Sequence, residues 1–139
     1  MNKMIFVFLL LSSLCIAGCT KEEKPKKNNI PKSTLYFGEG KYWFGTYTIS
    51  KVDSMYYDSL TIQYINDGMH SKIGNIEYEL KTDNQKLESS FPRPLSGYDY
   101  FHISTGLNAE LIEKGLPKKA TLQIQWKDKK ETIILKRQN

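Results

Sequence analysis

Alternation of apolar and polar residues runs through most of the chain after residue 42 and limits the folds that it can adopt. Within residues 43–50, Trp43, Tyr47 and Ile49 share one phase, and the other phase includes Thr46, Thr48 and Ser50. Successive side chains of a β-strand point to opposite faces, so this pattern predicts strands with one buried and one solvated face. The same reasoning places these further residues in the core: Leu60, Ile62, Tyr64, Ile76, Tyr78, Leu80, Leu122, Ile124, Trp126, Ile133 and Leu135.

Weaker strands are predicted in residues 85–91 and 98–104, with Phe91, Phe101 and Ile103 as core candidates. Turn-forming residues separate the runs at 66–68, 83–84 and 128–129. One short helix is predicted over residues 109–114, with Asn108 as its N-cap, before Gly115 and Pro117.

Short alternating strands separated by frequent turns predict an all-β fold. One polar face per strand favours an antiparallel arrangement over a buried parallel sheet. We therefore expect an antiparallel immunoglobulin-like β-sandwich of about seven strands over residues 35–139, with a small open β-barrel as the alternative.

The first 18 residues have the parts of a secretory signal: a positive charge at Lys3, an apolar stretch over residues 4–11, and small residues before Cys19. A membrane-spanning helix needs about 20 apolar residues, so this stretch is too short for a comfortable span. We expect residues 1–18 to be a signal peptide that is removed.

Ile16, Ala17, Gly18 and Cys19 resemble the lipobox of bacterial lipoproteins. The resemblance implies that the Cys19 thiol receives a diacylglyceryl group and becomes the first residue of the mature chain. Cys15 would then be lost with the signal peptide, which leaves the mature domain without a disulfide. The expected location is the extracytoplasmic face of the cell membrane.

Residues 19–34 are predicted to be a tether between this anchor and the domain. Residues 20–34 hold five lysines and two glutamates, so their net charge is 5 − 2 = +3, and they contain one large apolar side chain, Ile30. Such a composition does not bury enough apolar surface to fold. Residues 35–139 hold 14 basic and 13 acidic residues, 14 − 13 = +1, so we expect no nucleic-acid partner.

The two ends of the domain resemble a family of small lipoproteins of Gram-positive bacteria. Gly38, Glu39 and Trp43 match its Gly-Glu-x-x-x-Trp opening. Its closing hairpin, Trp-Asn-Gly-Lys followed by Glu-Thr, is matched by Trp126, Lys129, Glu131 and Thr132, with Lys127-Asp128 in place of Asn-Gly. The resemblance implies an extracytoplasmic immunoglobulin-like fold, with no assigned activity and no catalytic residues.

Residues suited to catalysis or metal binding are sparse. His70 and His102 are the only histidines and lie in different segments, whereas a metal site usually needs three or four ligands. Glu77 and Glu79 share one strand face, a spacing that glycoside hydrolysis uses, but Asn75 and Lys81 beside them indicate a solvated face. We expect no catalytic residues, no metal and no cofactor.

Tyrosines next to loops favour a binding surface, because a rigid amphipathic ring gains contact area at low entropic cost. The best candidate is residues 91–100, where two prolines flank Arg93 and where Tyr98 and Tyr100 follow. The same tyrosines could instead cover the edges of the sheets.

Anchor, tether and domain together predict a non-catalytic binding or structural module of the cell envelope, acting on an envelope protein or a wall component. The alternatives are a small envelope hydrolase or metal-binding protein, and an accessory or immunity lipoprotein that shields a membrane target.

Overall fold

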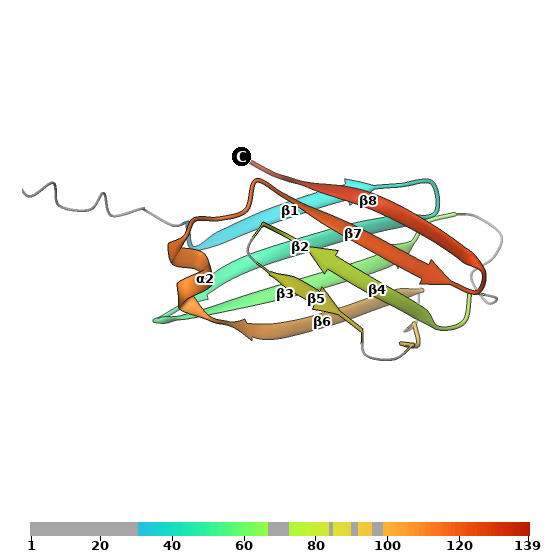
Figure 1. Cartoon of the computed structure of the whole chain (residues 1–139), viewed down its shortest axis with the longest axis horizontal. Coiled ribbons are helices and arrows are strands. Elements are labelled where there is room, and N and C mark those ends of the chain that lie inside the picture. Colours follow the sequence, from blue (N-terminus) through green and yellow to red (C-terminus); the bar gives the residue numbers. More distant parts are fainter. Residues whose placement is uncertain (1–30, 67–72, 84, 90–91, 96–98) are drawn as a thin grey trace, which may run out of the picture.

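The computed structural model describes residues 31–66, 73–83, 85–89, 92–95 and 99–139. These residues form strands and one short helix (Figure 1). The elements are β1 (Ser33–Glu39), β2 (Trp43–Val52), β3 (Met55–Tyr64), β4 (Ile76–Lys81), β5 (Lys86–Glu88), β6 (Tyr100–Leu107), α2 (Ala109–Glu113), β7 (Lys119–Trp126) and β8 (Lys129–Arg137).

In the described part of the chain, eight antiparallel strands form one sheet in the order β5-β4-β7-β8-β1-β2-β3-β6. The sheet curls so that β4, β5 and β7 lie across from β2, β3 and β6 (Figure 1). The ring centroids of Tyr78 on β4 and Phe101 on β6 are 5.1 Å apart across this interior. The predicted all-β antiparallel fold is confirmed: the halves face each other as in a sandwich, and the β8–β1 pair joins them as in the open-barrel alternative.

The core follows the predicted alternation. Every residue that the alternation assigned to the core in β2, β3, β4, β7 and β8 is buried. Phe101 and Ile103 on β6 are half-buried and pack against this core, whereas Phe91 lies outside the described residues. The alternation of apolar and polar residues therefore predicts the main core correctly. Strand β6 has no fully buried residue and contributes less to the core than the other long strands.

Strand β1 is the strand that the alternation does not reveal, and it begins at Ser33, within the predicted tether. Its inward positions are Thr34, Tyr36 and Gly38, whereas Leu35 and Phe37 point to solvent. Leu35 and Phe37 therefore point outward, whereas the apolar residues of a half-buried strand usually point toward the core.

The predicted helix is confirmed as a single short turn, α2. The Asn108 side chain accepts a hydrogen bond from the Glu110 amide at 3.0 Å, as an N-cap does. The β7–β8 hairpin turns through Lys127 and Asp128, and φ is +50° at Lys127. A type I′ turn needs positive φ at both central residues, so this hairpin uses a different turn, in keeping with its lack of Asn-Gly.

A narrow pairing of β1 with β8 joins the two halves of the sheet. Only Tyr36↔Arg137 and Phe37↔Lys136 are paired between these strands, and the Gln138 amide donates to the Leu35 carbonyl at 2.9 Å. A Cβ atom on Gly38 would collide with the Ile134 carbonyl oxygen and would lie 2.9 Å from Cγ2 of Ile133. The absence of a side chain at residue 38 thus permits this close approach.

We predict that Gly38→Ala destabilises the fold by about 2 kcal/mol. The reason is that a methyl group forced into the packed contact between β1 and β8, the β1–β8 seam, costs roughly 1–3 kcal/mol. The melting temperature of a domain of this size should fall by about 10 °C. Gly106→Ala is the matched control, because a Cβ there meets no atom within 4 Å. Equal melting temperatures for the two variants would contradict the role of Gly38.

Candidate functional site

Of the three residues predicted to form a binding surface, the structure describes Arg93 and Tyr100. Arg93 pairs with Ile76 through two backbone hydrogen bonds of 2.7 and 2.8 Å, so it lies at the end of β4. Burial raises the pKa of Tyr78, and the Arg93 guanidinium nearby partly opposes this rise. Tyr100 begins β6 and points to solvent with 41% of its surface exposed. Tyr98 lies outside the described residues, as do Cys19 and the lipobox residues Ile16, Ala17 and Gly18.

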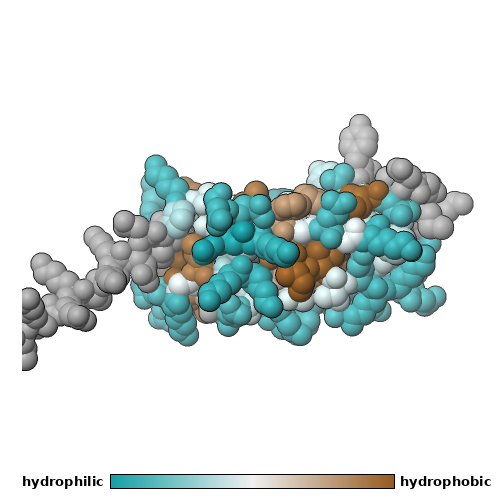
Figure 2. All heavy atoms as spheres, turned by 90° about the horizontal axis from the view of Figure 1, so that it is seen from above, coloured by the Kyte–Doolittle hydropathy of each residue, from teal (hydrophilic) through white to brown (hydrophobic). Residues whose placement is uncertain are grey.

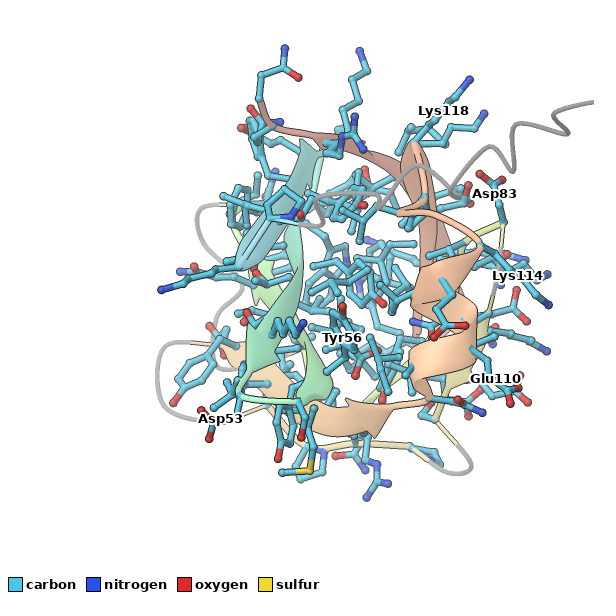
Figure 3. All side chains as sticks on the ribbon, turned by 90° about the vertical axis from the view of Figure 1, so that its left-hand side faces the viewer. Asp53, Tyr56, Asp83, Glu110, Lys114 and Lys118 are labelled. Atoms are coloured by element: carbon cyan, nitrogen blue, oxygen red, sulfur yellow. The ribbon has the colours of Figure 1, made fainter. Side chains whose placement is uncertain are left out.

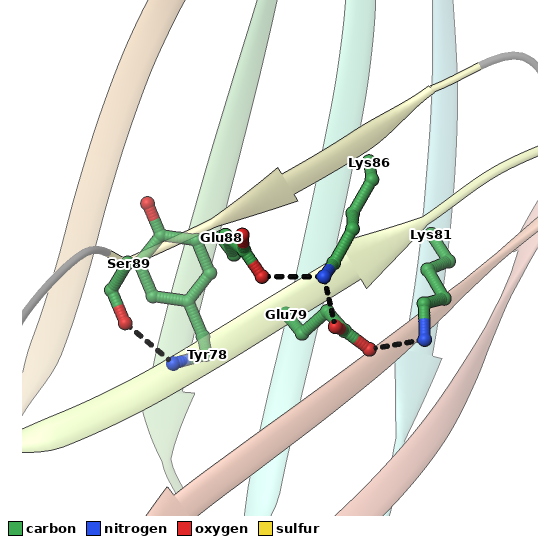
Figure 4. Close-up of polar contacts among 6 residues, drawn as sticks. All are labelled: Tyr78, Glu79, Lys81, Lys86, Glu88 and Ser89. Atoms are coloured by element: carbon green, nitrogen blue, oxygen red, sulfur yellow. Dashed lines mark hydrogen bonds and ion pairs between the residues drawn. The ribbon is translucent and has the colours of Figure 1, made fainter.

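The carboxylates considered for hydrolysis lie on the outer face of β4, as the alternation predicts. Glu79 forms ion pairs with Lys81 at 2.6 Å and with Lys86 at 2.8 Å, and Lys86 also contacts Glu88 at 2.6 Å (Figure 4). Hydrogen bonds from the two lysines lower the pKa of Glu79 to about 2. Glu79 is therefore ionised at physiological pH and does not supply the protonated acid that glycoside hydrolysis requires.

An open polar cavity of about 150 Å³ lies beside this ion-pair cluster. Its lining residues come from β4, β7 and the chain around β5: Glu77, Tyr78, Glu79, Glu88, Ser89, Gln123 and Gln125. Ser89 closes one side by accepting a hydrogen bond from the Tyr78 amide at 3.0 Å (Figure 4). The lining offers hydrogen-bonding groups but little apolar surface, unlike the mostly apolar pockets that hold small ligands.

A buried carboxylate, Asp58, lies inside the sheet on β3 and was not expected from the sequence. It is 3% exposed. Its oxygens accept hydrogen bonds from the Tyr47 hydroxyl at 3.2 Å, from the Gln85 amide at 3.1 Å and from the Thr105 hydroxyl at 2.5 Å. Gln85 also donates to the Tyr47 hydroxyl. These bonds join the two facing halves of the sheet, because Tyr47, Asp58 and Thr105 lie on β2, β3 and β6 and Gln85 precedes β5.

The electrostatics of this group indicate a structural role. Burial, followed by the neighbouring Asp58 carboxylate, raises the pKa of the Tyr47 hydroxyl well above its usual value, so the hydroxyl stays protonated and donates. Asp58 continues the inward phase of Leu60 and Ile62, and this continuity is the sequence signal that could have revealed it. The alternation predicted the strand only from Leu60, because an aspartate interrupts the apolar pattern.

The histidine on β6 lies on the opposite face of the sheet from this carboxylate. His102 is exposed on the outer face, and its Nδ1 atom lies 3.0 Å from the Thr61 hydroxyl. His70 lies outside the described residues. Within the described ranges, no three His, Cys, Asp or Glu side chains gather in a way that could hold a metal ion.

The two end segments that carry the family resemblance meet at one end of the sheet. The rings of Trp43 and Trp126 pack edge to face with centroids 5.4 Å apart. The Glu131 carboxylate accepts hydrogen bonds from the backbone amides of Lys41 at 2.5 Å and of Tyr42 at 3.1 Å. The β1–β2 turn is thus held by β8, so these residues have a direct structural function.

Tyr42 forms the outer layer of this aromatic cluster. Its ring stacks on Tyr64 with centroids 6.5 Å apart, and the ammonium groups of Lys41 and Lys129 lie 5.1 and 5.5 Å from its centroid. Cations close to an aromatic ring stabilise it, and Tyr42 has two such neighbours. Tyr42 is therefore packed against the core, although it lies outside the alternating pattern that predicted the core residues.

Comparison of the chain with protein-family models, with curated proteins and with solved structures found no match. Within the part of the chain that the structure describes, no helix has the length and hydropathy needed to cross a bilayer.

We predict that Asp58→Ala destabilises the domain by roughly 3 kcal/mol, because the Tyr47, Gln85 and Thr105 donors then lose a buried acceptor. The measurement is urea unfolding followed by tryptophan fluorescence. Ser59→Ala is the control, because residue 59 lies next to Asp58 in the outward phase of the same strand. A loss no greater than that of Ser59→Ala would contradict the structural role of Asp58.

Proposed function

We propose that the protein is a lipoprotein of the cell envelope, held at the extracytoplasmic face of the membrane by a diacylglyceryl group on Cys19. Its domain acts as a non-catalytic binding or structural module toward an envelope protein or a wall component. The observation that carries the proposal is the sequence Ile16-Ala17-Gly18-Cys19, separated by four residues from the short apolar stretch over residues 4–11.

The physical reason for a diacyl anchor is its strength. A single acyl chain gives marginal, reversible membrane binding, and a second chain makes the attachment stable. Between Cys19 and Ser33, where β1 begins, lie 33 − 19 = 14 residue steps, which reach at most about 50 Å when fully extended. The domain would thus remain close to the membrane while sampling the space in front of it.

The site chemistry supports a non-catalytic role for the described residues. Glu79 is engaged by two lysines, and Asp58 is enclosed by three hydrogen-bond donors. A general acid or base must instead reach a substrate proton. Both carboxylates are therefore better suited to holding the sheet together.

We predict that cells supplied with an alkyne-bearing fatty acid label the wild-type chain and the Cys15→Ser control, but not Cys19→Ser. The thiol of residue 19 is the proposed attachment point, whereas Cys15 lies within the segment that is removed. The readout is fluorescence of the purified protein after coupling to the alkyne. Label on Cys19→Ser equal to that on the wild type would exclude the anchor.

A further inference from the structure

Large apolar side chains lie exposed on the outer face of the β1–β8 seam. Leu35 is 43% exposed, Phe37 40% and Ile134 42%. The Phe44 ring on β2 extends this group, with its centroid 5.8 Å from that of Phe37. Figure 2 looks onto the molecule from above, the side on which β1 and β8 lie, and shows apolar surface gathered between hydrophilic side chains. We call Leu35, Phe37, Phe44 and Ile134 the seam patch.

Cations border the seam patch. Lys119 on β7 is paired directly opposite Lys136 on β8, and both residues are exposed in the outward phase of their strands. Like charges directly opposite each other destabilise a sheet in water, so this pair favours an anion over it. Lys118 points outward at the top of the molecule in the end-on view, near β8 (Figure 3).

The outward positions of β7, β8 and β1 and those of β4 and β5 carry net charges of opposite sign. The outward positions of β7, β8 and β1 hold three lysines and one glutamate, Lys119, Lys130, Lys136 and Glu39, so their net charge is 3 − 1 = +2. The outward positions of β4 and β5 hold two lysines and three glutamates, Lys81, Lys86, Glu77, Glu79 and Glu88, which gives 2 − 3 = −1. An anionic surface would therefore attract the outer face of β7, β8 and β1 and repel that of β4 and β5.

We infer that the seam patch is a docking surface for anionic lipid headgroups, which lays the domain against its own membrane. The inference rests on the proposed function, because the anchor on Cys19 supplies the membrane. The tether enters the fold at β1, the strand that carries Leu35 and Phe37, so the seam is within its reach. Apolar rings would enter the headgroup region while the lysines contact lipid phosphates.

A second copy of the chain fits this face less well. In a two-fold dimer each patch meets an identical patch, so two faces that each carry a net charge of +2 would be brought together. Anionic lipid instead neutralises the same charges, and each basic residue near such a surface strengthens binding by about fivefold. Charge complementarity therefore selects the membrane as the occupant.

The test uses the mature, lipidated full chain in vesicles of phosphatidylglycerol and phosphatidylcholine, with and without bromine atoms on the acyl chains. Bromine quenches a tryptophan that lies at the lipid. Phe37→Trp reports on the seam patch, and Tyr100→Trp is the matched control on β6, where the side chain is equally exposed. Trp43 and Trp126 are 0% and 4% exposed. The emission of the unsubstituted protein in the same vesicles is therefore the background that is subtracted.

We expect bromine to lower the added emission of Phe37→Trp at least twofold and to leave that of Tyr100→Trp unchanged. Adding Lys119→Gln and Lys136→Gln to the Phe37→Trp variant should weaken this quenching. Circular dichroism confirms that each variant is folded.

Equal quenching of the two reporters in protein that sediments with the vesicles would overturn the docking surface and leave the anchor intact. Protein that does not sediment with the vesicles would contradict the anchor itself. An unquenched Phe37→Trp whose emission shifts to the blue as protein concentration rises would assign the face to a second copy, and would overturn the inference equally.

Discussion

The fold depends on the close approach of β1 and β8. Two residue pairs, Tyr36↔Arg137 and Phe37↔Lys136, connect what would otherwise be two separate sheets. Gly38 permits this approach because no side chain occupies the space next to Ile134. Tyr36 secures it from inside by donating a buried hydrogen bond of 2.8 Å to the carbonyl of Pro117, just before β7. With this seam in place, β4 and β7 can lie across from β2 and β3 and bury one common core.

Two carboxylates, those of Asp58 and Glu131, join separate parts of the curled sheet by hydrogen bonds, in addition to the apolar packing of the core. Asp58 joins β2, β3 and β6 to the chain before β5 through hydrogen bonds in the interior. Glu131 joins β8 to the turn between β1 and β2. Both carboxylates accept from neutral donors, so their bonds fix geometry without the desolvation cost of a second buried charge. These carboxylates and the seam explain how a domain without a disulfide maintains two facing layers.

Asn108 as an N-cap, with Gly115 and Pro117 as stop signals, predicted the short helix, and the alternation of residues was sufficient to predict the fold class and the main core. It missed β1, because Thr34, Tyr36 and Gly38 face inward while Leu35 and Phe37 face outward. It also missed Asp58, since a buried carboxylate depends on donors from distant segments that no local pattern reveals. The predicted binding surface stays a prediction: Arg93 pairs with Ile76 at the start of β4, Tyr100 points to solvent from β6, and Tyr98 and Cys19 lie outside the described residues. These positions depend on which residues of distant strands pair with each other. The local alternation of apolar and polar residues does not specify that pairing.

The outward Leu35 and Phe37, which made β1 hard to predict, also give the seam an apolar outer face beside basic residues. The docking surface inferred for this face requires a membrane nearby, so the proposed lipid on Cys19 is the central claim. The most direct test is the intact mass of the protein purified from the membrane fraction. The account predicts a chain that begins at Cys19 and carries acyl groups. An unmodified chain, recovered from the medium, would contradict it.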